Sequence, residues 1–138
     1  MKKILFHCEL YQSAALNLGL LFLRVAFGLT MAFSHGIGKI PPSDSFIGNV
    51  AKMGFPLPAA FAWGASLSEF LGGLFLALGL ATRLSALSRV VTMGVAAFVV
   101  HASDPFRTKE LSLAYLVVGV FYFFTGAGKY SVDGLINK

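Results

Sequence analysis

Two histidines close long apolar stretches of this chain, and imidazole is the side chain whose charge changes most readily near neutral pH. His35 ends "RVAFGLTMAFSH", and His101 ends "RVVTMGVAAFVVH". Asp104 follows shortly afterwards, and Glu110 opens the next apolar stretch. If these four groups meet, they could relay a proton, hydrogen-bond a quinone carbonyl, ligate a metal or hold a haem iron through both imidazoles. The simpler alternative is that each histidine only ends its helix and is hydrated by water or lipid head groups.

Four more charged side chains lie within or beside apolar stretches, namely Arg24, Glu69, Arg89 and Lys39. An arginine at the centre of a bilayer costs about 2.5–3.5 kcal/mol on insertion scales, so Arg24 needs a partner. Arg24 lies ten residues from one end of its stretch, and Glu69 lies twelve from the end of the next stretch on the same side. At 1.5 Å per residue these depths differ by about 3 Å, so we predict an Arg24–Glu69 ion pair. The pair could hold two helices together, or it could form a site for a ligand or a proton.

The spacing of polar and small residues predicts an inward face for the first helix. Steps of four, three, four and four residues join Arg24, Gly28, Met31, His35 and Lys39, which places them on one stripe of an α-helix. Lys39 stands at the end of this stripe and could instead extend its ammonium group to the membrane interface. We expect the rest of the stripe to face the neighbouring helices.

A similar layout recurs in the third apolar stretch. Arg24 precedes His35 by eleven residues, and Arg89 precedes His101 by twelve. This indicates a faint parallel repeat of two helix pairs, an arrangement known from some transporters. The second halves match poorly, because Glu69 is central in its stretch whereas Glu110 begins its own.

The amino-acid composition predicts the kind of fold that positions these polar side chains. Of the 138 residues, 57% are hydrophobic and only 12% are charged, whereas a soluble domain has about a quarter of its residues charged. We therefore predict an all-α fold, an integral membrane four-helix bundle formed by a single domain over residues 1–138. Its spans are expected at 14–37, 59–80, 84–101 and 108–126. The apolar loop after Pro41 and Pro42 predicts a short interfacial helix around residues 46–53.

Several other classes are disfavoured by the residues that are present. Cys8 is the single cysteine, so the chain has neither an internal disulfide nor a C-x-x-C pair. The net charge of +5 is scattered among apolar runs and does not suggest nucleic-acid binding. The segment from Gly126 to Gly128 follows an apolar helix rather than a strand, so it is not a dinucleotide-binding loop. No cofactor motif is recognised, and we assign no metal site.

The distribution of basic residues gives an expected orientation. Lysine and arginine number five on the side of the termini and the second link, against four on the other side. The first span often dominates the orientation, and because the Lys2-Lys3 pair precedes it, both termini are expected in the cytoplasm. His35 and His101 would then lie near the outer face.

Three stretches together resemble the DoxX/DoxD family of small four-helix membrane proteins. They are "RVAFGLTMAFSHGIGK", "SEFLGGLFLALGLATRLSALSRVVTMGVAAFVVH" and "KELSLAYLVVGVFYFFTGAGKYSVD". The resemblance runs from about Leu16 to Asp133, nearly the whole chain. It implies a multi-pass protein of a bacterial or archaeal cytoplasmic membrane, with some members serving as subunits of thiosulfate:quinone oxidoreductases and others assigned to quinol oxidases or other membrane oxidoreductase complexes.

The resemblance and the polar groups support one functional hypothesis and one alternative. The first is a subunit of a quinone-linked oxidoreductase complex, in which Arg24, Glu69, Arg89 and Lys39 shape the site and His35, His101 and Glu110 act in catalysis. Quinone is the cofactor expected, and a redox partner subunit or a second copy of the chain is the partner expected besides the bilayer. The alternative is a membrane scaffold, a transporter or a module that binds a lipophilic ligand.

Overall fold

The structure is a computed structural model and describes residues 13–136, so Cys8, Lys2 and Lys3 lie outside the described range. The described part of the chain contains helices and no strand. Four of these helices are long and apolar enough to cross a membrane, over Ala14–Lys39, Pro58–Leu78, Thr82–Val100 and Phe106–Thr125. The predicted all-α bundle of four spans is therefore confirmed, with boundaries that differ from the expected ones by two residues or fewer.

The first and third spans both change helix type before they end. Helix α2, Ala14–Thr30, continues as the π-helix η1, Met31–Gly36, and then as the 3₁₀ turn η2, Ile37–Lys39. Helix α5, Thr82–Val95, continues as the π-helix η3, Ala96–Val100. Such wide turns are rare and often occur at functional sites, because the extra residue re-aims the side chains that follow. Each one directly precedes or contains a candidate histidine.

The predicted short helix in the first loop is present as α3, Asp44–Lys52. The Ser43 hydroxyl caps it by accepting a hydrogen bond from the Phe46 N–H at 3.2 Å. Helix α3 packs against α4, Pro58–Leu78, and buries Val50. The loop is thus an ordered part of the molecule.

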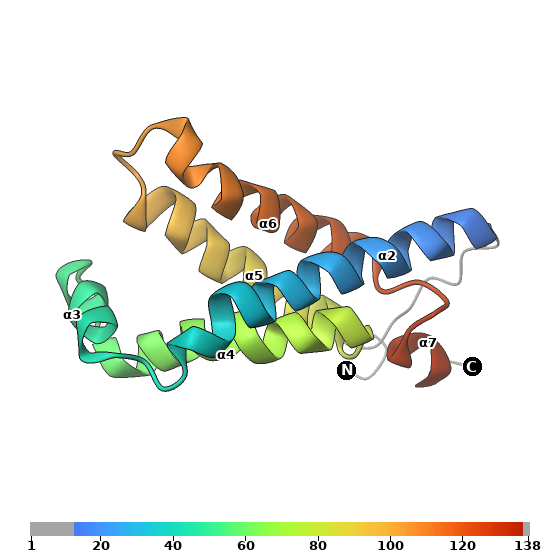
Figure 1. Cartoon of the computed structure of the whole chain (residues 1–138), viewed down its shortest axis with the longest axis horizontal. Coiled ribbons are helices and arrows are strands. Elements are labelled where there is room, and N and C mark those ends of the chain that lie inside the picture. The colour runs from blue at the N-terminus through green and yellow to red at the C-terminus, as the bar shows by residue number, and fades with distance from the viewer. Residues whose placement is uncertain (1–12, 137–138) are drawn as a thin grey trace.

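The long helices pack in sequence, with α2 against α4, α4 against α5, and α5 against α6, Phe106–Thr125 (Figure 1). The pairs α2–α4 and α5–α6 diverge toward the end that carries α3 (Figure 1). We call this the open end, formed by residues 37–58 and 101–106. The opposite, hairpin end holds the α4–α5 connection at residues 79–81 and the tail of residues 126–136, which includes the short helix α7, Val132–Ile136.

The backbones of α2 and α4 touch through glycines. A Cβ atom added at Gly28 would lie 2.6 Å from the Gly73 carbonyl oxygen, and one added at Gly36 would lie 2.5 Å from the Phe70 nitrogen. Small residues allow this approach, which gives dispersion contacts in lipid where the hydrophobic effect between helices is weak. The close contact fixes α2 and its polar stripe against α4.

The outer surface of the bundle is apolar. Among the side chains most exposed along the four spans are Phe22, Val91, Val117 and Phe124, whose exposed fractions run from 59% to 76%. Large exposed apolar surfaces are uncommon in soluble monomers and suit contact with acyl chains. With four spans, this surface defines a multi-pass membrane protein.

The tail closes the hairpin end, which the sequence pattern did not predict. The Asp133 carboxylate accepts hydrogen bonds from the N–H groups of Ala81 and Thr82, each at 2.8 Å, and so caps the start of α5. The Asn17 side-chain oxygen accepts a hydrogen bond from the Lys129 N–H at 2.7 Å. The tail thus folds back after Gly126 and joins α2 to the α4–α5 turn.

Candidate functional site

A cavity of about 250 Å³ lies at the open end of the bundle. All four membrane-spanning segments contribute to it. Polar side chains form much of its wall, and two methionines and a leucine supply apolar surface. Its lining residues are Met31, His35, Lys39, Glu69, Met93, Ala96, His101, Thr108, Leu111, Ser112 and Tyr115.

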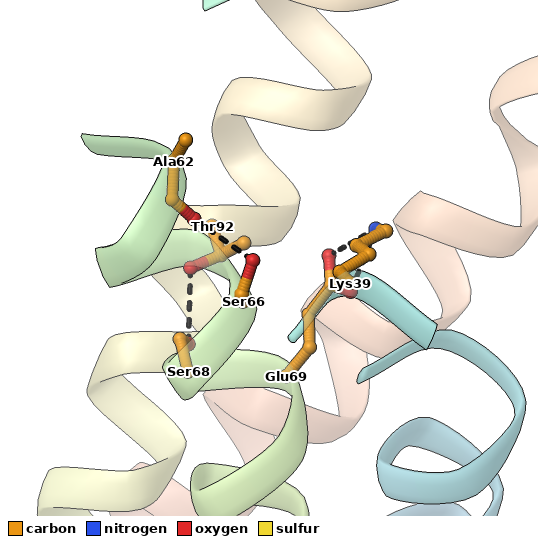
Figure 2. Close-up of polar contacts among 6 residues, drawn as sticks. All are labelled: Lys39, Ala62, Ser66, Ser68, Glu69 and Thr92. Carbon is orange, nitrogen blue, oxygen red and sulfur yellow. Dashed lines mark hydrogen bonds and ion pairs between the residues drawn. The ribbon is translucent and has the colours of Figure 1, made fainter. Parts of the chain in front are cut away.

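Lys39 and Glu69, which both line the cavity, form an ion pair (Figure 2). The Lys39 ammonium donates to both carboxylate oxygens of Glu69, at 2.8 and 2.7 Å. Figure 2 shows Glu69 leaving α4 toward the turn η2, which carries Lys39. The Glu69 side chain is only 7% exposed, so this pairing compensates a carboxylate that water scarcely reaches. Lys39 therefore belongs to the site and is not merely extended to the interface.

The predicted Arg24–Glu69 pair is wrong. The Arg24 guanidinium is buried and donates instead to the backbone carbonyl oxygens of Ala77 and Tyr130, at the hairpin end. Side chains on a helix tilt toward its N-terminus. On α2 this tilt carries Arg24 away from the open end, and on the turn η2 it carries Lys39 down into the bundle toward Glu69.

His35 and His101 both line the cavity, as the topology of the four spans led us to expect. The His35 ring meets the Tyr115 ring edge to face, with centroids 5.9 Å apart and an interplanar angle of 76°. The Nδ1 atom of His101 lies 2.8 Å from the Asp104 carboxylate oxygen Oδ2, so Asp104 joins the cluster through this histidine. The site thus holds two imidazoles that approach from different helices.

Glu110 is not part of this arrangement. It is exposed and does not line the cavity. Helix α6 begins at Phe106, so Glu110 already lies on its second turn, about 200° around the axis from both Thr108 and Ser112. The expectation that Glu110 would converge with the histidines is therefore wrong.

Arg89 lies beneath the cavity rather than on its wall. Its side chain is 1% exposed and projects toward Gly72, where an added Cβ would lie 3.9 Å from the guanidinium Nη2. It interacts electrostatically with Glu69 and Tyr115, which both line the cavity. Four charged residues were predicted to shape a site. Lys39 and Glu69 line the cavity and Arg89 lies behind it, whereas Arg24 bonds to backbone carbonyl oxygens at the hairpin end.

Tyr115, Ser112 and Thr108 are cavity residues that the sequence reasoning missed. A signal for them existed, because their steps of four and three residues place three hydroxyl groups on one face of an apolar helix. Tyr115 also packs with Met31 and Met93 in a buried cluster that forms the floor between η1, α5 and α6. The three hydroxyl-bearing residues and Leu111 therefore make up the part of the cavity wall that α6 contributes.

The suspected repeat is visible in local structure. The π-helix η1 begins seven residues after Arg24, and η3 begins seven residues after Arg89. The equivalent alanines, Ala32 and Ala97, are both fully buried. Each half of the bundle thus contains a helix that carries a buried arginine and then widens into a π-helix at or just before its histidine.

The donor set does not form a metal centre. Across the described residues, no group of three or more His, Cys, Asp or Glu side chains could hold a metal ion. The cavity instead offers hydrogen-bond donors from imidazole, phenol, hydroxyl and ammonium groups, beside methionine side chains that adapt to an apolar ring. This arrangement can bind and orient a small polar ring and can exchange a proton with it.

The fold and the site together define a small four-span helical membrane protein with a polar cavity at one end. The DoxX family matches residues 19–102, more than half of the 138 residues, and the chain belongs to this family. The family match ends at the third span, before α6 and the tail.

Two curated relatives match most of the chain. A Haemophilus influenzae protein named "Uncharacterized protein" is 32% identical over 114 residues, which cover 77% of this chain and 76% of that protein. A Bacillus subtilis protein named "Putative oxidoreductase CatD" is 28% identical over 123 residues, which cover 88% of this chain and 90% of that protein. No solved structure matches the chain.

Proposed function

We propose that this protein is a quinone-binding subunit of a membrane oxidoreductase complex in the cytoplasmic membrane of a bacterium or archaeon. The observation that carries the proposal is the cavity, in which His35, His101 and Tyr115 approach one space from three helices. A quinone ring presents carbonyl oxygens that accept hydrogen bonds, and imidazole, phenol and ammonium groups donate them. The name of the Bacillus subtilis relative, an oxidoreductase, agrees with this class.

The size of the cavity fits a ring rather than a whole lipid. Its volume of about 250 Å³ lies just below the range of about 300–1,000 Å³ typical of sites for drug-sized ligands. A quinone head group would occupy it while its isoprenoid tail lay between the helices or along the apolar outer surface. In this role His35 and His101 would bind the ring and exchange protons, and a partner subunit would supply the electrons.

The test measures quinone binding to purified protein. We expect a short-chain quinone to raise the melting temperature in detergent, because a ligand that binds only the folded state stabilises it. His35→Ala and His101→Ala should each weaken binding about two- to tenfold, as expected for the loss of one hydrogen bond. Lys52→Ala, at an exposed position of α3 on the same end, is the matched control and should bind like the wild type. If neither histidine variant binds more weakly, the ring does not occupy this cavity.

A transporter or scaffold is the second candidate, and the repeat of α2 and α5 favours it, because transporters often consist of internal repeats. Mass spectrometry of the lipids that co-purify with the protein separates the two candidates. A quinone in the wild-type extract that is depleted in the His35→Ala extract supports the redox subunit. An extract without quinone supports the second candidate.

A further inference from the structure

The Arg89 guanidinium is a buried charge that has no hydrogen-bond partner in the described part of the chain. Its side chain is 1% exposed, and none of its three nitrogens has a partner among residues 13–136. A buried charge without a partner costs several kcal/mol, since water no longer solvates it. Inside a membrane such a group is more often kept for a ligand or a charge pathway than for packing.

Arg89 lies directly behind the floor of the cavity. Its guanidinium lies beside Gly72, and Glu69 stands three residues nearer the open end of α4, about 4.5 Å along the axis. One turn after Arg89 on α5, Met93 lines the cavity. The positive charge therefore lies about one helical turn below the lining residues, within electrostatic range of Glu69 and Tyr115.

The other charges around the cavity largely cancel each other. Both oxygens of Glu69 accept from Lys39, so this carboxylate is already matched by one cation. Asp104 is bound to His101 at the rim, and its side chain is 45% exposed, so water and salt screen it. Of the two buried arginines, Arg24 bonds to carbonyl oxygens at the hairpin end, so Arg89 is the buried arginine that lies near the cavity.

We propose that the cavity prefers a ring that carries an ionised oxygen, such as a hydroxyquinone or a deprotonated quinol, and that Arg89 supplies the compensating charge. This inference rests on the proposed quinone function. In surroundings of low polarity a fixed charge acts beyond direct contact, so the guanidinium need not touch the ring. A neutral ring of the same shape gains nothing from this field.

The experiment compares two probes that differ in charge. The first is a hydroxynaphthoquinone whose hydroxyl is ionised at neutral pH, and the second is its neutral methyl ether. We expect the wild type to bind the anionic probe roughly tenfold more tightly, which corresponds to about 1.4 kcal/mol. Arg89→Met should abolish this preference without changing the affinity for the methyl ether, and Arg89→Lys should keep part of it. Arg107→Met, which removes an exposed arginine at the open end, should bind both probes like the wild type.

Melting of the ligand-free protein distinguishes this role from a structural one. Arg89 donates no hydrogen bond to the described residues, so Arg89→Met should melt at the wild-type temperature or above it. Equal binding of the two probes by the wild type, or a preference that persists in Arg89→Met, overturns this inference and leaves the quinone proposal standing. Failure of both probes to bind overturns both proposals.

Discussion

The Lys39–Glu69 pair is asymmetric in its exposure to water. The Lys39 side chain is 39% exposed and that of Glu69 is 7% exposed. Without Glu69, the ammonium group could still be solvated, and the Phe46 ring, whose centroid lies 5.7 Å from it, would remain. Without Lys39, the Glu69 carboxylate would remain buried beside the cavity, where it interacts with Arg89 only electrostatically. The carboxylate thus depends on the pair more strongly than the ammonium does.

This asymmetry predicts unequal costs for the two single changes. Lys39→Met should lower the free energy of unfolding by about 1–3 kcal/mol, because it leaves a buried acceptor without its donor. Glu69→Gln should cost less, and the double variant should recover much of the Lys39→Met loss. Unfolding in mixed micelles, followed by circular dichroism, measures all three variants. A double variant whose loss equals the sum of the single losses would contradict the pairing.

A double-mutant cycle of Arg24→Met and Glu69→Gln is the control for the Lys39–Glu69 cycle. Arg24 bonds to the Ala77 carbonyl oxygen, eight residues or about 12 Å along α4 from Glu69. Sites this far apart normally contribute additively to stability. We therefore expect no coupling in this cycle.

At the scale of elements, the contact of α2 with α4 sets the position of the whole polar stripe. An added Cβ at Gly28 would lie 2.7 Å from the Ala77 nitrogen, whereas Gly19, on the same helix, has no atom within 4 Å of such a Cβ. Backbone atoms cannot rotate out of the way as a side chain can. The glycine at position 28 is therefore required by close approach, and the glycine at position 19 is not.

Alanine at these two glycines should have opposite effects. Gly19→Ala should be neutral or slightly stabilising, because alanine is favoured over glycine in a helix by about 0.8–1.0 kcal/mol. Gly28→Ala should destabilise the protein by about 1–3 kcal/mol, since the helices must separate to accept the methyl group. The same micelle unfolding assay measures both changes. Equal stability of the two variants would show that the helices are not held at this distance.

The sequence could predict the features that arise from local patterns. Long apolar runs set the spans, the prolines set the first loop, and steps of three and four residues placed His35 and Lys39 on an inward face. It could not predict the tail, because the Asp133 carboxylate bonds N–H groups that become available only when the α4–α5 hairpin has formed. The similar depths of Arg24 and Glu69 in the membrane were also not enough to predict an ion pair between them. The direction in which each side chain tilts along its helix decides which groups it reaches.

At the scale of the molecule, the two ends of the bundle differ in construction. The hairpin end is closed by hydrogen bonds between side chains and the backbone of the tail and the turn. Arg24 donates to a carbonyl oxygen, whereas the side-chain oxygens of Asn17 and Asp133 accept from N–H groups. The open end instead carries the cavity, which Lys39, His35 and His101 line. In the proposed role a ligand would enter from the open end or between the diverging helix pairs, and the orientation of the chain would decide which side of the membrane supplies its protons.

We predict that both termini lie in the cytoplasm, so that the cavity opens toward the outer face. The reason is the positive-inside bias, with the Lys2-Lys3 pair ahead of the first span. A fluorescent protein fused after Lys138 should fluoresce, and alkaline phosphatase inserted at Gly54, in the loop of the open end, should be active. Exchanging the two reporters is the control and should silence both. An active phosphatase after Lys138 would show that the orientation is the reverse of the predicted one. In that case His35 and His101 would exchange protons with the cytoplasm rather than with the outer side.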